Sequence, residues 1–93
     1  MSDQRAPFAV VMLTLNEEQN LPKALASING RAPVVIVDSE STDRSEEIAR
    51  AHGAEWIVQP FNDYASQRNF ALAQVESRFR WIFFLDADEE FTP

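Results

Sequence analysis

The feature that most constrains this 93-residue chain is a regular alternation of short apolar runs with helical patterns. Apolar runs of strand length cover residues 8–15, 33–38, 55–59 and 80–86. Helical patterns separate them over about residues 20–29, 43–52 and 63–77. Strands that alternate with helices in this way form right-handed crossovers and a parallel sheet. The sequence therefore predicts one α/β domain with the element order βαβαβαβ.

Individual residues predict where the helices begin and end. Gly30 is expected to end the first helix. Asp43 is placed to begin the second helix with Glu46 in capping-box position, and Gly53 follows its last turn. Four aromatic residues on the predicted strands are expected in the core: Trp56, Trp81, Phe83 and Phe84.

Charge and composition exclude several partners. The net charge of −7 repels phosphate backbones, so no nucleic-acid partner is expected. No cysteine is present, which excludes disulfides and thiol chemistry. The longest apolar run, residues 8–13, is far shorter than the roughly 20 residues that span a bilayer, and the first residues do not resemble a signal peptide. We therefore expect a cytoplasmic protein.

Polar side chains follow three of the four predicted strands, at residues 14–18, 38–43 and 86–90. The third strand ends at Gln59 and Pro60 with no comparable chemistry. Open α/β sheets bind ligands at the carboxyl ends of their strands, so we expect the site there.

The last of these segments carries four acidic residues: Asp86, Asp88, Glu89 and Glu90. Like charges so close together repel, and a cation relieves that repulsion. Asp86 and Asp88, two residues apart, are suited to a hard divalent ion, Mg²⁺ or Mn²⁺. The alternative is a solvated acidic loop, because so short a motif also occurs by chance.

Two other residues have both a functional and a structural interpretation. Asp38 ends an apolar strand, where its carboxylate could accept hydrogen bonds from a base or a ribose, or could instead cap a helix or close a turn. Ser39 shares that ambiguity. Arg68, in the third helix, could donate to a base or a diphosphate, or could be an ordinary solvated arginine.

Familiar nucleotide and phosphate signatures are missing from the first loop. Residues 16–21 contain no glycine, which excludes a G-x-G-x-x-G or Walker A loop there. A receiver domain would need a lysine from a later strand, and the only lysine is Lys23 in the first helix.

Four segments together resemble a known family. They are Thr-Leu-Asn-Glu-Glu (14–18), Val-Ile-Val-Asp-Ser-Glu-Ser-Thr-Asp-Arg-Ser (35–45), Gln-Arg-Asn-Phe-Ala-Leu (67–72) and Phe-Leu-Asp-Ala-Asp-Glu (84–89). In this order they resemble the nucleotide-binding half of family 2 glycosyltransferases of the GT-A fold. More narrowly, the chain is similar to the lipopolysaccharide and lipooligosaccharide core β-1,4-glucosyltransferases.

The resemblance implies a Rossmann-like three-layer fold with strand order 3-2-1-4 and a UDP-linked sugar as donor. Asp38 would contact the base, Arg68 would lie beside the base or the phosphates, and Asp86 would lie near the ribose or a metal-bound water. Asp88 would ligate the Mg²⁺ or Mn²⁺ ion, with Asp86 beside it. The remaining candidate nucleotide-binding residues are Thr14, Asn16, Glu17 and Ser39.

Two residues depart from the family pattern. Leu15 stands where many relatives have an aromatic residue that stacks on the base, and Glu40 replaces a common glycine. We also expect residues 1–93 to be the donor-binding portion alone, inactive by itself, because the family's acceptor-binding strands, catalytic base and membrane-associating tail would lie beyond Pro93. The resemblance implies inverting transfer of glucose to a glycolipid or polysaccharide, at the inner face of the membrane in the full-length enzyme.

Two alternatives remain. The first is a non-catalytic nucleotide-binding or interaction module of the same fold, forming a homo-oligomer through its fourth strand. The second is a nucleotidyltransferase, which is disfavoured because Asn16 to Glu18 replace the Gly-rich basic loop usual in that class.

Overall fold

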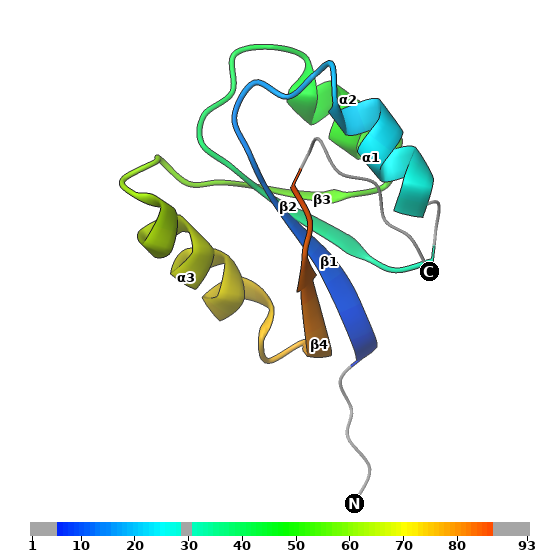
Figure 1. Cartoon of the computed structure of the whole chain (residues 1–93), viewed down its shortest axis with the longest axis vertical. Helices are drawn as coiled ribbons and strands as arrows, with labels where there is room; N and C mark the ends of the chain where they lie inside the picture. Colours follow the sequence, from blue (N-terminus) through cyan, green and yellow to red (C-terminus); the bar gives the residue numbers. More distant parts are fainter. Residues whose placement is uncertain (1–5, 29–30, 87–93) are drawn as a thin grey trace, which may run out of the picture.

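The computed structural model describes residues 6–28 and 31–86, which form four strands and three helices in alternation (Figure 1). The elements are β1 (Ala6–Thr14), α1 (Leu21–Ile28), β2 (Val34–Asp38), α2 (Ser45–Ala51), β3 (Glu55–Val58), α3 (Tyr64–Val75) and β4 (Phe79–Phe84). The predicted order βαβαβαβ is confirmed. Gly30, the expected end of the first helix, lies outside the described residues.

The four strands form one parallel sheet in the order β3-β2-β1-β4. This is the 3-2-1-4 order that the resemblance implied. β1 and β2 are central, so the loops that follow them leave the same edge of the sheet side by side. That edge is where the candidate residues of the first two motifs gather.

Helices cover both faces of the sheet, with α1 and α2 on one side and α3 on the other (Figure 1). Residues 9–12 of β1 are completely buried, and they alternate between the two layers. Val10 and Met12 pack with α1 and α2, whereas Ala9 and Val11 pack with α3. The continuous apolar run of β1 is therefore explained by burial on both faces.

The helices contact the sheet in different ways. α1 buries four apolar side chains with helical spacing: Leu21, Ala24, Leu25 and Ile28. α3 instead buries Gln67, Ala71 and Val75, one residue per turn, and is otherwise largely polar. The small Ala71 allows α3 to lie close to the sheet, and Gln67 brings an amide into the layer beneath it.

The predicted capping box of α2 is wrong. The helix begins at Ser45, and Arg44 at its N-cap position makes no side-chain capping bond. Asp43 accepts hydrogen bonds from the backbone amides of Ser45 and Glu18, so it binds both the start of α2 and the loop after β1. Glu46 pairs with Arg50 one turn later. The C-terminal signal is correct, because Gly53 follows the helix with φ +79°.

The core prediction is also wrong for two aromatic residues on β4. Trp81 and Phe83 are 67% and 56% exposed, although Phe84 is half-buried against the α3 layer. β4 pairs only with β1 among the described strands, so it is an edge strand of the sheet. Its apolar sequence therefore faces solvent on one side.

Candidate functional site

The carboxyl ends of β1 and β2 are joined by their last residues. Thr14 and Asp38 are register partners, and both are buried. The Thr14 hydroxyl donates to Asp38 Oδ1 at 2.6 Å, and the Ser39 amide donates to the Thr14 carbonyl at 2.9 Å. Both strand ends are therefore fixed where the candidate site begins.

Asp38 also closes the turn that follows β2. Its Oδ2 accepts from the Ser41 amide at 2.6 Å, and its Oδ1 accepts from the Ser41 hydroxyl at 2.5 Å. With the Thr14 bond, three of the roughly four acceptor positions of the carboxylate are filled. The structural interpretation of Asp38 as a turn residue is thus confirmed, and its buried carboxylate is held by bonds within the protein.

The two loops after β1 and β2 are linked by further reciprocal hydrogen bonds. The Asn16 amide donates to the Ser41 hydroxyl at 2.7 Å, and the Asn16 side-chain oxygen accepts from the Thr42 amide at 2.9 Å. The Glu17 amide donates to the buried Ser45 hydroxyl at 2.9 Å. Asn16 has φ +52°, a left-handed conformation that asparagine tolerates better than most residues. These candidate nucleotide-binding residues therefore hold the loops in place.

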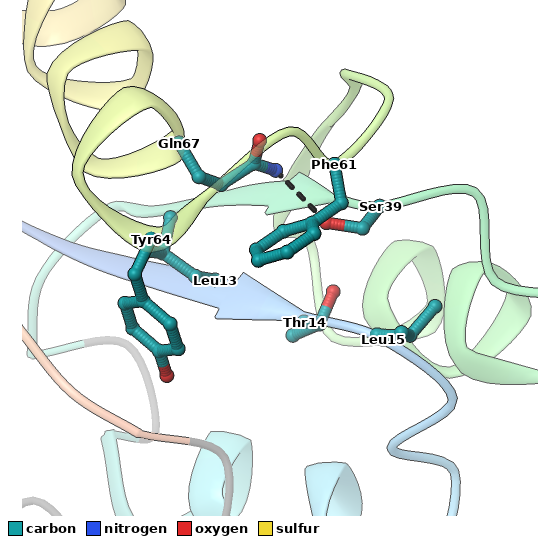
Figure 2. Close-up of a pocket in the computed structure, with 7 residues that line it drawn as sticks. All are labelled: Leu13, Thr14, Leu15, Ser39, Phe61, Tyr64 and Gln67. Carbon is teal, nitrogen blue, oxygen red and sulfur yellow. Dashed lines mark hydrogen bonds between the residues drawn. The ribbon is translucent and has the colours of Figure 1, made fainter.

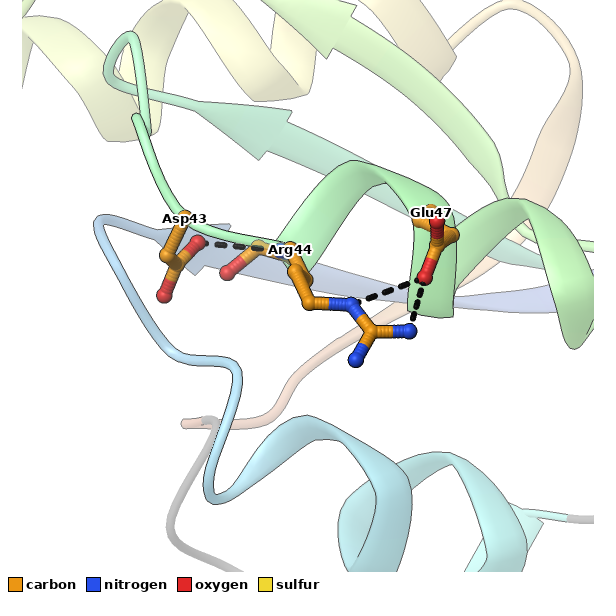
Figure 3. A network of polar contacts seen from close by, with 4 residues as sticks. Asp43, Arg44 and Glu47 are labelled. Atoms are coloured by element: carbon orange, nitrogen blue, oxygen red, sulfur yellow. Dashed lines mark hydrogen bonds and ion pairs between the residues drawn. The ribbon is translucent and has the colours of Figure 1, made fainter.

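Asp43, drawn in Figure 3 with Arg44 and Glu47, completes the link between the loops through the Glu18 amide, and the pKa of its carboxyl is shifted. Partial burial raises the pKa of its carboxyl, but hydrogen bonds from Ser45 and from the Glu18 amide outweigh that effect and lower it below its usual 3.8. The neighbouring Arg44 points away from Asp43 and pairs with Glu47. The charged form of Asp43 is therefore stabilised by the loop itself.

A pocket of about 220 Å³ opens beside these strand ends (Figure 2). Its walls are mostly apolar, and it is lined by Leu13, Thr14, Leu15, Ser39, Phe61, Tyr64 and Gln67. An apolar pocket with a few polar groups, at the carboxyl edge of a parallel sheet, is typical of a small-molecule site. The candidates Thr14 and Ser39 thus share a pocket, whereas Asn16, Glu17 and the buried Asp38 do not line it.

The polar groups of the pocket are fixed from beneath by α3. Gln67 is buried, and its amide nitrogen donates to the Ser39 hydroxyl at 3.1 Å and to the Gln59 carbonyl at 3.4 Å. Figure 2 shows the first of these bonds crossing from α3 to the end of β2. Because Ser39 Oγ accepts here, its own proton is available for a ligand.

Arg68 is exposed on α3, next to Gln67 in the sequence. Its guanidinium carbon lies 4.0 Å from the centre of the Phe84 ring, a cation–π contact with the end of β4. The Arg68 side chain therefore connects α3 with the end of β4, and it does not line the pocket.

Asp86 lies just beyond β4, on the same edge of the sheet as Thr14 and Asp38. The Leu85 amide before it donates to the Val11 carbonyl of β1 at 3.0 Å, and the Asp86 side chain is exposed. Asp88, Glu89 and Glu90 lie outside the described residues. Within residues 6–28 and 31–86, no three acidic or histidine side chains form a group that could hold a metal ion. The metal site therefore remains a prediction.

Sequence reasoning missed the aromatic wall of the pocket. Phe61 and Tyr64 follow β3, the strand end at which no chemistry was expected, and their rings form an edge-to-face pair with centres 6.4 Å apart. They are 54% and 69% exposed. The available signal was two aromatic residues within an otherwise polar segment, where no core requires them.

The sequence profile described as glycosyl transferase family 2 matches residues 9–93. The chain belongs to this family. Among its glycosyltransferase relatives, the lipopolysaccharide core biosynthesis glycosyltransferase LpsC of Rhizobium meliloti is 37% identical over 90 residues, which cover 91% of this chain and 33% of LpsC. The uncharacterized glycosyltransferase RT0209 of Rickettsia typhi is 38% identical over 86 residues, or 91% of this chain and 29% of that protein.

A solved structure is also similar in three dimensions. Residues 1–349 of S. aureus TarS in complex with UDP match with a TM-score of 0.67 and 27% identity, over 90% of this chain and 28% of TarS. The chain thus has the nucleotide-binding half of the GT-A fold and spans about a third of the length of its glycosyltransferase relatives. No helix in the described ranges has the length and apolar character needed to cross a bilayer.

Proposed function

We propose that this chain is the donor-binding portion of a metal-dependent, inverting glycosyltransferase that uses a UDP-sugar, UDP-glucose in particular. The observation that carries the proposal is the pocket at the carboxyl ends of β1 and β2, which Thr14 and Ser39 line. Family membership gives the reaction class, and the UDP complex of TarS supports a uridine nucleotide as ligand. Residues 1–93 would form one donor-binding unit, with acceptor-binding residues supplied from outside it.

The candidate residues divide into two groups in this proposal. Ser39 would donate to the base from the pocket, and Asp38 would contact the base from the end of β2, next to Ser39. Arg68 would neutralise phosphate charge from its position beside β4. Thr14, Asn16 and Glu17 would act mainly by holding the loops that the nucleotide contacts.

A divalent cation, Mg²⁺ or Mn²⁺, would be held by Asp88 with Asp86 beside it. Carboxylate oxygens are the ligands that these hard cations prefer, and the exposed Asp86 just beyond β4 fits such a donor set. When bound, the cation would supply Lewis-acid stabilisation of negative charge on the departing diphosphate. Arg68 would add positive charge from the protein, and the apolar pocket would exclude water from the base.

The acceptor and the cellular site are part of the same proposal, and the name of one relative supports the acceptor class. LpsC acts in lipopolysaccharide core biosynthesis by its name, so we propose a glycolipid or polysaccharide acceptor at the cytoplasmic face of the membrane. Inversion requires a base that deprotonates the acceptor hydroxyl. We assign that base to no residue of this chain, and we expect the 93-residue protein to bind donor without transferring sugar.

Calorimetric titration tests the donor site. UDP and UDP-glucose would be titrated with and without Mn²⁺ into the wild-type chain, Asp88→Ala and the control Glu90→Gln. The proposal predicts Mn²⁺-dependent binding that Asp88→Ala loses and Glu90→Gln keeps. Absence of binding to the wild type by any uridine nucleotide would refute it, and metal-independent binding would refute the role of Asp88.

The second candidate is a non-catalytic interaction module, supported by the exposed aromatic face of β4. Phe8 and Phe83 lie edge to face with ring centres 6.3 Å apart, and Trp81 pairs in register with Phe8. A second copy of the chain could cover these rings and form a homo-oligomer. Light scattering coupled to size exclusion would detect it, and Trp81→Ser would dissociate it. A monomer at every concentration would exclude this candidate.

A further inference from the structure

The pocket has an aromatic wall formed by two residues that follow β3. Leu15 follows β1 and is 51% exposed at one side of the pocket. Phe61 and Tyr64 approach the same pocket from the segment between β3 and α3 (Figure 2). An apolar aliphatic side chain and an aromatic pair therefore form two walls of one space.

We propose that Phe61, braced by Tyr64, is the surface on which the nucleotide base stacks. This inference rests on the proposed function and specifies how that site recognises its ligand. A flat base gains dispersion and quadrupole contact with an aromatic face, and most of that gain requires an exposed ring. Phe61 meets that requirement, because half of its side chain is exposed beside a preformed pocket.

The polar groups of the pocket fit a base with carbonyl oxygens. Gln67 donates to Ser39 Oγ, which leaves the Ser39 proton for an acceptor in the pocket. Uracil presents carbonyl oxygens at its edge and an aromatic face. Stacking on Phe61 with a hydrogen bond from Ser39 would use both features at once.

Local structure holds Phe61 and Tyr64 in position. Asp63, between them in sequence, caps α3 by accepting from the Ser66 amide at 2.7 Å. Tyr64 is the first residue of α3, so its ring position follows from the helix. Its edge-to-face contact then limits the movement of Phe61. The wall is therefore partly ordered before a ligand arrives, which reduces the entropic cost of binding.

Calorimetric titration of UDP with Mn²⁺ tests the inference on the full 93-residue chain. Phe61→Ala should weaken UDP binding by about 5- to 150-fold, the range for loss of one base–aromatic stack. Phe61→Tyr should stay within about twofold of wild type, because the aromatic face is kept. Trp81→Ala, which removes an exposed aromatic residue outside the pocket, is the matched control and should leave the dissociation constant unchanged.

Proton NMR of UDP adds a readout that a purely structural role would not change. A base stacked on a phenyl ring has its H5 and H6 resonances shifted upfield, and Phe61→Ala should reduce that shift. If the wild type binds UDP and Phe61→Ala binds it equally well with the same resonance positions, the stacking inference is wrong while the donor site stands. If the wild type binds no UDP, the proposed function itself fails.

Discussion

The Thr14 hydroxyl donates a 2.6 Å hydrogen bond to the buried carboxylate of Asp38, and this bond joins the ends of β1 and β2. Asp38 in turn fixes Ser41, whose hydroxyl accepts from the Asn16 amide in the loop after β1. The two motif segments therefore support each other through a closed set of hydrogen bonds. A residue in this set affects both the stability of the domain and the shape of the pocket beside it.

Thr14→Val should destabilise the protein by about 1–3 kcal/mol. Valine has nearly the shape of threonine but cannot donate, so the substitution leaves a buried carboxylate oxygen with one partner fewer. Urea denaturation monitored by circular dichroism measures the change. Thr42→Val is the matched control, since Thr42 is exposed and only its backbone amide bonds to Asn16; it should change stability by less than about 0.5 kcal/mol. Equal effects of the two substitutions would contradict the role of the Thr14 hydroxyl.

Glu40→Gly should be more stable than Glu40→Ala by about 0.5–1 kcal/mol. Glu40 has φ +64°, which costs a residue with a Cβ roughly 1–2 kcal/mol, while glycine loses about 0.5–1 kcal/mol more entropy on folding. Both substitutions remove the same charge, so their difference isolates the backbone. Thermal denaturation of the pair provides the measurement.

The opposite result is expected at a helical position. Ala26 is exposed within α1, and Ala26→Gly should lower stability by about 1 kcal/mol because glycine disfavours the helix. If Glu40→Gly is also less stable than Glu40→Ala, the left-handed backbone conformation of Glu40 does not cost the protein stability.

Asp43→Asn should weaken the dependence of stability on acid pH. Partial burial opposes ionisation of Asp43, but the Ser45 and Glu18 hydrogen bonds outweigh it and hold its pKa below 3.8 in the folded state. A lowered folded pKa contributes stability above the unfolded pKa, and that stability is lost as the pH falls through the folded value. The wild type should therefore lose stability below about pH 4 more steeply than Asp43→Asn.

Urea denaturation midpoints between pH 6 and pH 2.5 would compare the two proteins. Glu55→Gln serves as a second acidic variant, because the hydrogen bonds from Arg78 lower the pKa of Glu55, the first residue of β3, below its usual 4.5. Removing both groups should flatten the profile further than either alone. Parallel wild-type and Asp43→Asn profiles would show that Asp43 does not contribute.

The order of elements could be predicted because apolar runs of strand length alternate with helical periodicity throughout the chain. The strand order came from the resemblance, since periodicity alone does not distinguish one parallel order from another. The same patterns misplaced Trp81 and Phe83, because a central strand and an edge strand with one exposed apolar face have the same sequence signature. How far the side chains of β4 are buried depends on the elements that pack beside it, and the sequence of β4 does not specify those elements.

The candidate site was predicted in part for a similar reason. Polar residues after β1 and β2 were found from their position at strand ends, and Thr14 and Ser39 do line the pocket. Phe61 and Tyr64 could not be found that way, because they line the pocket from the segment after β3 and from the first residue of α3, whose position depends on how α3 packs. Asp43 was expected to begin α2 with Glu46 in capping-box position, but the helix begins at Ser45, and the Asp43 carboxylate accepts from the Ser45 amide and from the Glu18 amide of the neighbouring loop. In each case, contacts between residues far apart in the sequence determine where the side chain lies, and sequence patterns do not show such contacts.

Asp63→Ala should destabilise the protein by about 1 kcal/mol and weaken UDP binding in the same variant. The Asp63 carboxylate accepts from the Ser66 amide and hydroxyl at the start of α3, and this largely polar helix buries only a few side chains that could hold it without a cap. Loss of the cap should fray the turn that carries Tyr64, and with it the pocket wall. Asp63→Ser keeps a capping oxygen and should restore most of both properties. Thermal denaturation and UDP titration of the three proteins would show whether stability and binding change together; a loss of stability with unaltered UDP affinity would mean that the aromatic wall does not depend on the start of α3.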